Sequence, residues 1–222
     1  MLFELLKELE PFQASLVAVS KTKPVEAIQV LYDEGQRAFG ENRVQELMEK
    51  VDRLPRDIQW HMIGHLQTNK IKYIAPYIHL IQSADRPKLI RAIQVEGEKI
   101  DRVIPVLLQL HIAAEETKFG FTEEELQDFF EKDPPDRFDH VEFQGVMAMA
   151  TFTEDQEQIR SEFARTKAIY DRVKAAYFAG NPAFKECSMG MSGDYKIALE
   201  EGATMIRVGT LLFGPRPCLL NP

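Results

Sequence analysis

The sequence predicts a single (β/α)8 barrel, and three features of the chain support that prediction. Short apolar runs alternate with amphipathic stretches along the chain, which is typical of parallel strands joined by helical crossovers. The alternation repeats eight times in 222 residues, about 28 residues for each unit, and such barrels span roughly 200 to 400 residues. No Gly-x-Gly-x-x-Gly motif follows any strand, which weighs against the competing open, doubly wound sheet. We therefore expect residues 1–222 to form one barrel domain.

The first strand–helix unit shows the pattern most clearly. Its strand, 15–20, is apolar at every position from Leu16 to Val19, as expected for a strand covered on both faces. Pro24 then favours the first turn of a helix at 25–34, which ends at Gly35. Further strands are predicted at 37–41, 58–63, 78–82, 103–110, 141–147, 184–188 and 204–208. The remaining helices are predicted at 43–54, 68–77, 86–100, 122–131, 154–178 and 194–201, and the tail 213–222 closes the chain.

A separate amphipathic helix is predicted at the N-terminus, residues 1–10. Its apolar residues recur at helical spacing, which favours a helix packed on the surface of the barrel: Leu2, Leu5, Leu6 and Leu9. The acidic residues between them argue against a secretory signal peptide. No apolar run approaches the roughly 20 residues that a membrane span needs. We therefore expect a cytoplasmic protein with no membrane partner.

Charge and cysteine content exclude other classes. The chain carries 27 Lys and Arg against 35 Asp and Glu, and this net charge of -8 argues against a nucleic-acid partner. Cys187 and Cys218 do not form a disulfide framework, and Cys187, in an apolar strand, is expected to be a buried free thiol. His61 and His65 are four residues apart, but they flank a turn at Gly64 rather than sharing a helix face, so no metal site is expected.

Two lysines, Lys21 and Lys23, follow the first strand. A lysine at the end of a strand, backed by an apolar wall, can lose its proton at low cost, because burial and a second nearby cation both disfavour the ammonium form. The neutral amine can then attack an aldehyde. The alternative is that both lysines are solvated loop residues that precede a helix.

The loops after the seventh and eighth strands have the features of a phosphate site, and barrels often bind phosphate there. Ser192 is expected to cap the helix at 194–201, and Gly193 exposes backbone N–H groups at its start. Gly209 allows close approach of the backbone, and Thr210 offers a hydroxyl and an amide. The alternative is ordinary capping and turn chemistry in both loops.

A lysine that reacts with aldehydes, opposite a phosphate site, describes a site for pyridoxal 5′-phosphate. Arg207 is then the candidate that faces the pyridine nitrogen, where it would keep that nitrogen unprotonated and weaken the ring as an electron sink. The alternative for Arg207 is a phosphate or carboxylate contact elsewhere in the site.

Five motifs, in chain order, carry a resemblance to a known family. They are Ala18-Val19-Ser20-Lys21-Thr22-Lys23-Pro24, Phe39-Gly40-Glu41-Asn42-Arg43-Val44-Gln45-Glu46, His61-Met62-Ile63-Gly64-His65-Leu66-Gln67-Thr68-Asn69-Lys70, Met189-Gly190-Met191-Ser192-Gly193-Asp194 and Ile206-Arg207-Val208-Gly209-Thr210-Leu211-Leu212-Phe213-Gly214. With these motifs the chain resembles, over nearly its whole length, the pyridoxal phosphate homeostasis proteins, single-domain relatives of alanine racemase. The chain departs from that family's pattern in His65, where proline is common, and in a short N-terminal helix.

The resemblance implies a site and a role. Lys21 would carry pyridoxal 5′-phosphate as a Schiff base, with Lys23 as a neighbour, and Asn42 would lie near the ring. Arg207 would meet the pyridine nitrogen, and the phosphate would be held by Ser192, Gly193, Gly209 and Thr210. The implied protein keeps the vitamin B6 supply and amino-acid levels balanced without efficient catalysis.

Two enzymatic alternatives remain open at this point. One is a pyridoxal phosphate-dependent amino-acid racemase, which needs an acid or base on each face of the substrate, whereas Lys21 serves only one. The other is an aldolase that forms a Schiff base between Lys21 and a sugar phosphate. A monomer is the expected state, because a small pocket at one end of a barrel does not require a second subunit. A regulatory protein partner also stays open.

Overall fold

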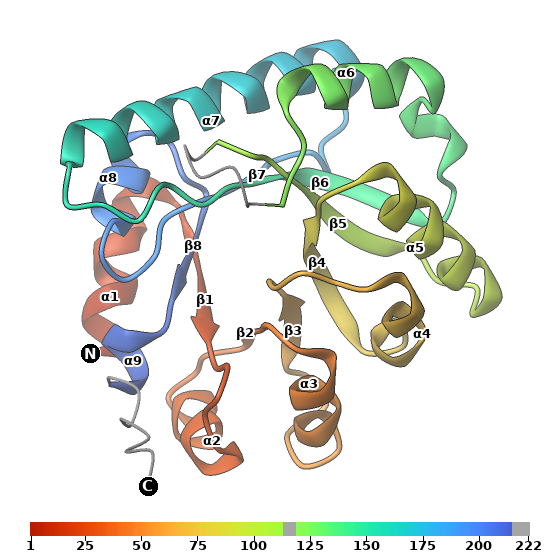
Figure 1. Ribbon diagram of the computed structural model, residues 1–222. Helices are drawn as coiled ribbons and strands as arrows, with labels where there is room; N and C mark the ends of the chain where they lie inside the picture. The colour runs from red at the N-terminus through yellow and green to blue at the C-terminus, as the bar shows by residue number, and fades with distance from the viewer. Residues whose placement is uncertain (113–118, 215–222) are drawn as a thin grey trace, which may run out of the picture.

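Eight parallel strands close into a barrel, with helices outside it (Figure 1). The computed structural model describes residues 1–112 and 119–214. Each strand pairs with the next along the chain, and β1 also pairs with β8, which closes the sheet. The strands are Ser15–Val19 (β1), Ala38–Glu41 (β2), Gln59–Met62 (β3), Ile78–Ala84 (β4), Ile104–Gln109 (β5), Val141–Met147 (β6), Glu186–Ser188 (β7) and Met205–Val208 (β8). The predicted barrel is confirmed, and the open sheet is excluded.

The helices follow the strands as predicted, with boundaries shifted by at most three residues. They are Leu2–Leu9 (α1), Val25–Asp33 (α2), Val44–Val51 (α3), Ile71–Ile74 (α4), Pro87–Lys99 (α5), Glu123–Lys132 (α6), Gln156–Tyr177 (α7), Tyr195–Glu200 (α8) and Thr210–Phe213 (α9), with 3-10 turns at Glu10–Phe12, Thr68–Lys70 and Pro135–Arg137. Two details differ from the predictions. The helix predicted at 68–77 is a 3-10 turn followed by the short α4, which stops before Pro76. The helix α9 was not predicted, because four residues are too few to show a period.

The register of the strands divides the core into two parts. Val17 pairs with Arg207 and Val19 with Gly40, and paired residues of parallel strands lie on the same face of the sheet. The barrel interior holds a small apolar cluster of Val17, Leu80, Leu107, Met147 and Met205. The larger hydrophobic core lies between the sheet and the surrounding helices. The apolar side of each helix therefore covers the outer face of the barrel.

The predicted buried thiol is confirmed at Cys187, which is fully buried in β7. Burial raises the pKa of its thiol to about 12, so the thiolate does not form at neutral pH. Cys218 lies outside the described residues. Among residues 1–112 and 119–214, no helix combines the length and the apolar character needed to cross a bilayer.

The helix α1 packs beside α8 on the outside of the barrel (Figure 1). Its residues Leu2, Leu5 and Leu9 are buried, as the leucine spacing predicted. The hydroxyl of Tyr195, the first residue of α8, donates a hydrogen bond to Glu8 (2.8 Å). The helix α1 thus packs against and hydrogen-bonds to α8, the helix that follows β7.

The tight pairing of β6 with β7 gives a first prediction, on stability. A Cβ at Gly145 (φ +149°) would lie 1.8 Å from the carbonyl oxygen of Glu186 in β7. Gly145→Ala should therefore cost about 3 kcal/mol or more of the free energy of unfolding, measured by urea denaturation. Gly180 is the matched control, since it also has a positive φ (+76°) but nothing within 4 Å of a Cβ. Gly180→Ala should cost about 1 kcal/mol, and equal losses in the two variants would contradict the register.

Candidate functional site

The first candidate residue, Lys21, lies in a tight turn at the carboxyl end of β1. The amide of Lys23 donates to the carbonyl of Ser20 (3.0 Å), which closes the turn around Lys21 and Thr22. Thr22 has a φ of +62°, a conformation that β-branched residues rarely adopt. The side chain of Lys21 is half-buried. The strand end therefore delivers Lys21 to the barrel mouth on a backbone of defined shape.

The two lysines of this turn have different surroundings. Lys23 Nζ donates to the carbonyl oxygens of Phe213 (3.1 Å) and Gly214 (3.4 Å), at the C-terminal end of α9. A cation is favourable there, because the last carbonyls of a helix carry partial negative charge. Lys23 therefore has a structural task in tying β1 to α9. This contact favours Lys21 as the reactive amine of the pair.

Asn42 follows β2 directly, at the same end of the barrel, as predicted. Its side-chain oxygen Oδ1 is buried and has no hydrogen-bond partner among the described residues. A buried acceptor left unpaired costs roughly 1–3 kcal/mol. Gly64 packs tightly on the backbone of Asn42, since a Cβ at Gly64 would lie 2.4 Å from the Asn42 carbonyl oxygen. Asn42 is therefore held in place with an acceptor that a bound donor would satisfy.

The two predicted phosphate loops contact each other. The amide of Gly209 donates to the hydroxyl oxygen of Ser192 (3.3 Å). The prediction that Ser192 caps the following helix was wrong. The helix α8 begins at Tyr195, with Asp194 at its N-cap position, because the amides of Asp194 and Tyr195 both bond to the carbonyl of Met191. The hydroxyl of Ser192 is thereby turned to the neighbouring loop.

These loops offer backbone donors beside the end of β1. The amides of Ser192 and Gly193 donate to no acceptor in the part of the chain that the structure describes, and a Cβ at Gly193 would meet nothing within 4 Å. A Cβ at Gly209 would lie 3.3 Å from the carbonyl oxygen of Val19, so this loop packs closely against β1. Thr210, the first residue of α9, is exposed. The loops thus combine amide and hydroxyl donors, which suit an oxyanion.

Arg207 lies in β8, buried in the barrel interior. Its guanidinium donates to the hydroxyl of Ser188 (2.6 Å) and to the carbonyl of Ala148 (2.8 Å), which are both neutral acceptors. These two bonds therefore do not support the alternative that Arg207 binds a carboxylate. Burial lowers the pKa of Arg207 to about 10, so the side chain keeps its positive charge at neutral pH.

The bond to Ser188 continues as a line of polar side chains across the barrel. The hydroxyl of Ser188 donates to Gln82 Oε1 (2.7 Å), and Gln82 Nε2 donates to His61 Nδ1 (2.8 Å). His61 is buried, its Nε2 has no partner among the described residues, and burial lowers its pKa to about 3. This line of polar side chains was not predicted from the sequence. The only available signal was a polar residue at an inward-facing position of an otherwise apolar strand.

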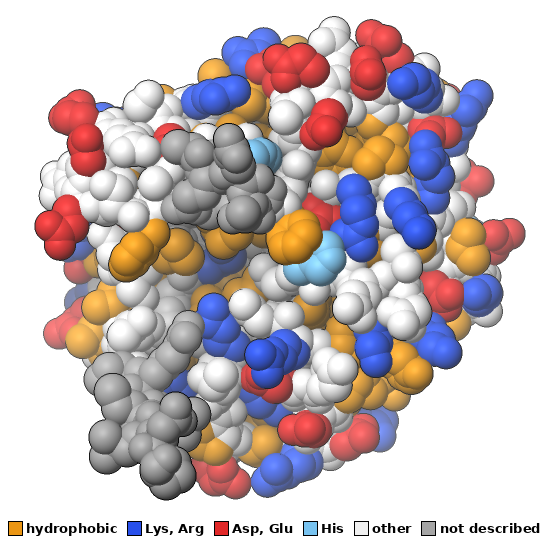
Figure 2. Space-filling model, viewed as in Figure 1, with side chains coloured by type: hydrophobic (Ala, Val, Ile, Leu, Met, Phe, Trp, Pro, Cys, Tyr) orange, Lys and Arg blue, Asp and Glu red, His pale blue; other side chains and the backbone are white. Residues whose placement is uncertain are grey.

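The second histidine of the sequence motif lies outside this line. His65 Nδ1 and Asp85 Oδ2 are 2.7 Å apart, and the ring of His65 stacks on Phe119 with centroids 3.9 Å apart. Within residues 1–112 and 119–214, no three His, Cys, Asp or Glu side chains converge as a metal site. On the face seen in Figure 2, basic side chains gather near the middle and acidic ones lie mainly toward the edge. An anionic ligand would be attracted to the middle of this face despite the net charge of -8.

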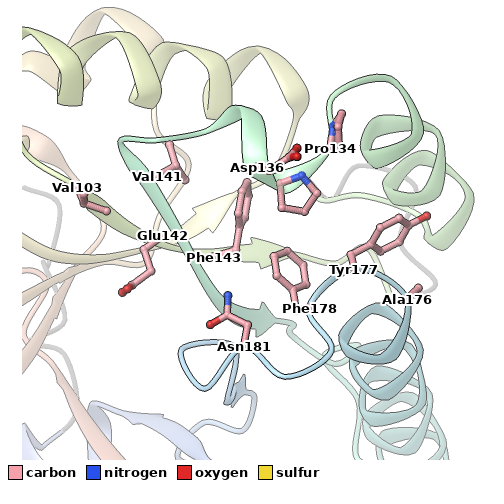
Figure 3. Close-up of a pocket in the computed structure, with 11 residues that line it drawn as sticks. Val103, Pro134, Asp136, Val141, Glu142, Phe143, Ala176, Tyr177, Phe178 and Asn181 are labelled. Carbon is pink, nitrogen blue, oxygen red and sulfur yellow. The ribbon is translucent and has the colours of Figure 1, made fainter.

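A cavity of about 690 Å³ lies at the opposite end of the barrel, near the start of β5 and β6 (Figure 3). The rings of Phe143 and Phe178 lie side by side in its wall, with centroids 5.6 Å apart. Its charged lining residues are Asp136 and Glu142, and no Lys or Arg is among the described residues that line it. An acidic and aromatic lining does not suit a phosphate ligand.

Comparison with known proteins agrees with the site's chemistry. Residues 3–217 match the family described as the alanine racemase N-terminal domain. The chain is 41% identical to the pyridoxal phosphate homeostasis protein of Aquifex aeolicus over 204 residues, which are 91% of this chain and 87% of that protein. It is 34% identical to the protein of the same name from Schizosaccharomyces pombe, over 91% of this chain and 84% of that protein. The chain belongs to the pyridoxal phosphate homeostasis protein family.

Solved structures extend this assignment. PipY of Synechococcus elongatus, solved with pyridoxal phosphate bound, matches this member of the family with a TM-score of 0.86 and 32% identity, over 96% of this chain and 98% of PipY. Alanine racemase from Bartonella henselae matches with a TM-score of 0.70 and 18% identity, over 97% of this chain but 59% of that enzyme. The second likeness shows a shared fold.

The buried His61 gives a prediction on pH. Below about pH 6.5 the unfolded chain protonates His61, whereas the folded protein does so only near pH 3. The free energy of unfolding should therefore fall as the pH decreases through this window, by up to about 1.4 kcal/mol per pH unit from His61 alone. His61→Asn keeps an acceptor for Gln82 but cannot be protonated. Urea denaturation of both proteins between pH 7.5 and 5 should show the two stabilities converging as the pH falls, and parallel curves would contradict a neutral, buried His61.

Proposed function

We propose that this protein binds pyridoxal 5′-phosphate reversibly at the carboxyl end of the barrel and serves vitamin B6 homeostasis in the cell. One observation carries the proposal: the end of β1 with Lys21, the buried unpaired acceptor of Asn42 and the donor-rich loops after β7 and β8 lie at the same end of the barrel. The pyridoxal phosphate bound to PipY supports the same ligand here. Family membership supports the homeostatic role.

In this proposal each residue has a distinct task. Lys21 forms the covalent bond to the cofactor, as a Schiff base. The phosphate is held by Ser192, Gly193, Gly209 and Thr210, whose hydroxyls and amides can donate to its oxygens. Asn42 lies near the ring and offers its buried oxygen. When bound, the cofactor supplies an electron-accepting ring to whatever amine is attached to it.

The position of Arg207 supports a protein that binds the cofactor without using it for catalysis. A guanidinium can only donate hydrogen bonds, so at the pyridine nitrogen it would leave that nitrogen without a proton and the ring a weaker electron sink. Racemisation would also need a second acid or base on the far face of the substrate. A tyrosine hydroxyl could serve, but that of Tyr195, the tyrosine that follows the loop after β7, donates to Glu8 (2.8 Å). We therefore propose a non-catalytic protein, acting as a cytoplasmic monomer.

Replacing Lys21 tests the covalent attachment. Lys21→Ala should abolish the visible absorption that appears when pyridoxal phosphate is added to the purified protein, because the two other amines near the end of β1 are engaged: Lys23 with the carbonyls of Phe213 and Gly214, and Lys50 with Ser20 and Glu41. Borohydride reduction followed by peptide mass mapping should locate the added mass on Lys21 in the parent protein. Circular dichroism checks that the variant is folded.

Lys23→Ala is the matched control, since Lys23 is bonded to the carbonyls of α9. It should retain the absorption and the labelled Lys21. A labelled Lys23 in the Lys21→Ala variant, with full absorption, would transfer the attachment to the second lysine. A parent protein that takes up no pyridoxal phosphate would overturn the proposed function.

Replacing the two loop hydroxyls tests the phosphate site. A hydrogen bond to a charged group contributes roughly 1.5–3 kcal/mol, so Ser192→Ala with Thr210→Ala should weaken equilibrium binding of pyridoxal phosphate about tenfold for each hydroxyl lost. Plain pyridoxal, which has no phosphate, should bind the parent and the double variant equally well in equilibrium dialysis. Unchanged affinity for the phosphorylated form would exclude these hydroxyls as phosphate ligands.

A further inference from the structure

The backbone on both sides of Lys21 is held by charged side chains from β2 and α3. The hydroxyl of Ser20, the residue before Lys21, donates to Glu41 Oε1 (2.6 Å). Lys50 donates to the carbonyl of Ser20 (3.0 Å). The amide of Thr22, the residue after Lys21, donates to Glu46 Oε2 (2.7 Å). We call Glu41, Glu46 and Lys50 the acid–base clamp.

The centre of the acid–base clamp is a buried ion pair. Lys50 Nζ lies 2.7 Å from Glu41 Oε1, and the two side chains are 8% and 0% exposed. Burial raises the pKa of Glu41, while Lys50 and the Ser20 hydroxyl oppose that rise. Glu41 Oε2 has no hydrogen-bond partner among the described residues. A buried ion pair with one oxygen unsatisfied is a poor way to stabilise a fold compared with apolar packing, so a different task for it is indicated.

The groups that the acid–base clamp binds indicate this task. Its bonds end on the side chain and carbonyl of Ser20 and on the amide of Thr22, and Lys21 lies between them. Thr22 is held at a φ of +62°, which L-residues with branched side chains avoid unless their surroundings fix them. Glu46 bonds to that strained residue directly, and its other neighbour is Lys50 at 3.8 Å. The clamp therefore determines how the backbone leads into and out of Lys21.

We propose that the acid–base clamp is a positioning device for Lys21, and that Glu46 is its key residue on the Thr22 side. The inference rests on the proposed function. When Lys21 joins an aldehyde, its neutral nitrogen attacks the carbonyl carbon and a carbon–nitrogen double bond replaces the carbon–oxygen one. The oxygen leaves as water with the two amine protons, and no electrons are exchanged. The rate of this condensation depends on the fixed direction of the amine, because aligned reacting groups avoid the entropic cost of finding each other.

Glu46 is the residue to test, because Glu41 and Lys50 are buried and losing either would leave an unpaired charge in the core. Glu46 is only partly buried. Glu46→Ala removes the acceptor for the Thr22 amide. Glu46→Gln keeps an acceptor oxygen but removes the charge. Glu49→Ala is the matched control, since Glu49 is exposed on the same helix and carries the same charge.

The readout is the rate at which Lys21 of the full-length protein is labelled by plain pyridoxal, trapped with borohydride and mapped by peptide mass spectrometry. Because pyridoxal has no phosphate, the rate does not depend on the phosphate loops. Amide hydrogen exchange of the peptide that contains residues 20–23, without ligand, reports the backbone directly. Thermal unfolding of each variant shows whether the fold is affected.

We expect Lys21 to be labelled about tenfold more slowly in Glu46→Ala than in the parent protein. Amide hydrogen exchange in residues 20–23 should be faster in Glu46→Ala than in the parent. The midpoint of thermal unfolding of Glu46→Ala should equal that of Glu49→Ala. Glu46→Gln should label at close to the parent rate. Parent-like labelling by Glu46→Ala would overturn the proposal, and so would a Glu46→Gln variant as slow as Glu46→Ala, since charge and not the hydrogen bond would then be responsible. Failure of the parent itself to be labelled at Lys21 would instead overturn the proposed function.

Discussion

The pairing of β1 with β8 is the contact on which the candidate site depends. It joins the first and last strands of the barrel in register, with Val17 opposite Arg207 and Ala18 opposite Val208. The ends of these two strands therefore meet, and Lys21 and Gly209 emerge side by side although they lie near opposite ends of the sequence. If the sheet were open between β1 and β8, Lys21 and the loop after β8 would lie at opposite edges of the sheet. Closure of the barrel therefore brings motifs that are distant in the sequence together at one candidate site.

The barrel interior is divided between stability and function. Its apolar cluster fills the space with Val17, Leu80 and Leu107 among others, as the interior of an eight-stranded barrel requires. Beside it lies the polar line from His61 to Arg207, which buries four polar side chains where apolar ones would pack at lower cost. The line holds the guanidinium through neutral partners, and among the described residues no carboxylate lies within hydrogen-bond distance of it. A ligand atom that accepts a hydrogen bond would gain most from that arrangement.

The positions of the candidate site residues could be predicted from the order of strands and helices in the sequence. Once eight strand–helix units are recognised, every strand end is known to lie at one mouth, so Lys21, Asn42 and Gly209 could be assigned there without coordinates. Side-chain partners were beyond such reasoning. The hydroxyl of Ser192 turns to Gly209 because a turn at Met191 delays the start of α8. The bond from Lys50 to Ser20 spans 30 residues, and periodicity carries no information on which polar groups meet across that distance.

The turn from Ser20 to Lys23 joins the two halves of the proposed ligand's site. Lys21 is the proposed attachment point, while Lys23, two residues on, bonds to the C-terminal carbonyls of α9, the helix that begins at Thr210. A shift of this turn would therefore move both the proposed reactive amine and the helix that follows the proposed phosphate loop. The acid–base clamp restrains the turn from the opposite side, through Ser20 and Thr22. In the proposed function, a ligand bound at its aldehyde and at its phosphate would be held by one short segment whose geometry is fixed before the ligand binds, which lowers the entropic cost of binding without adding a contact.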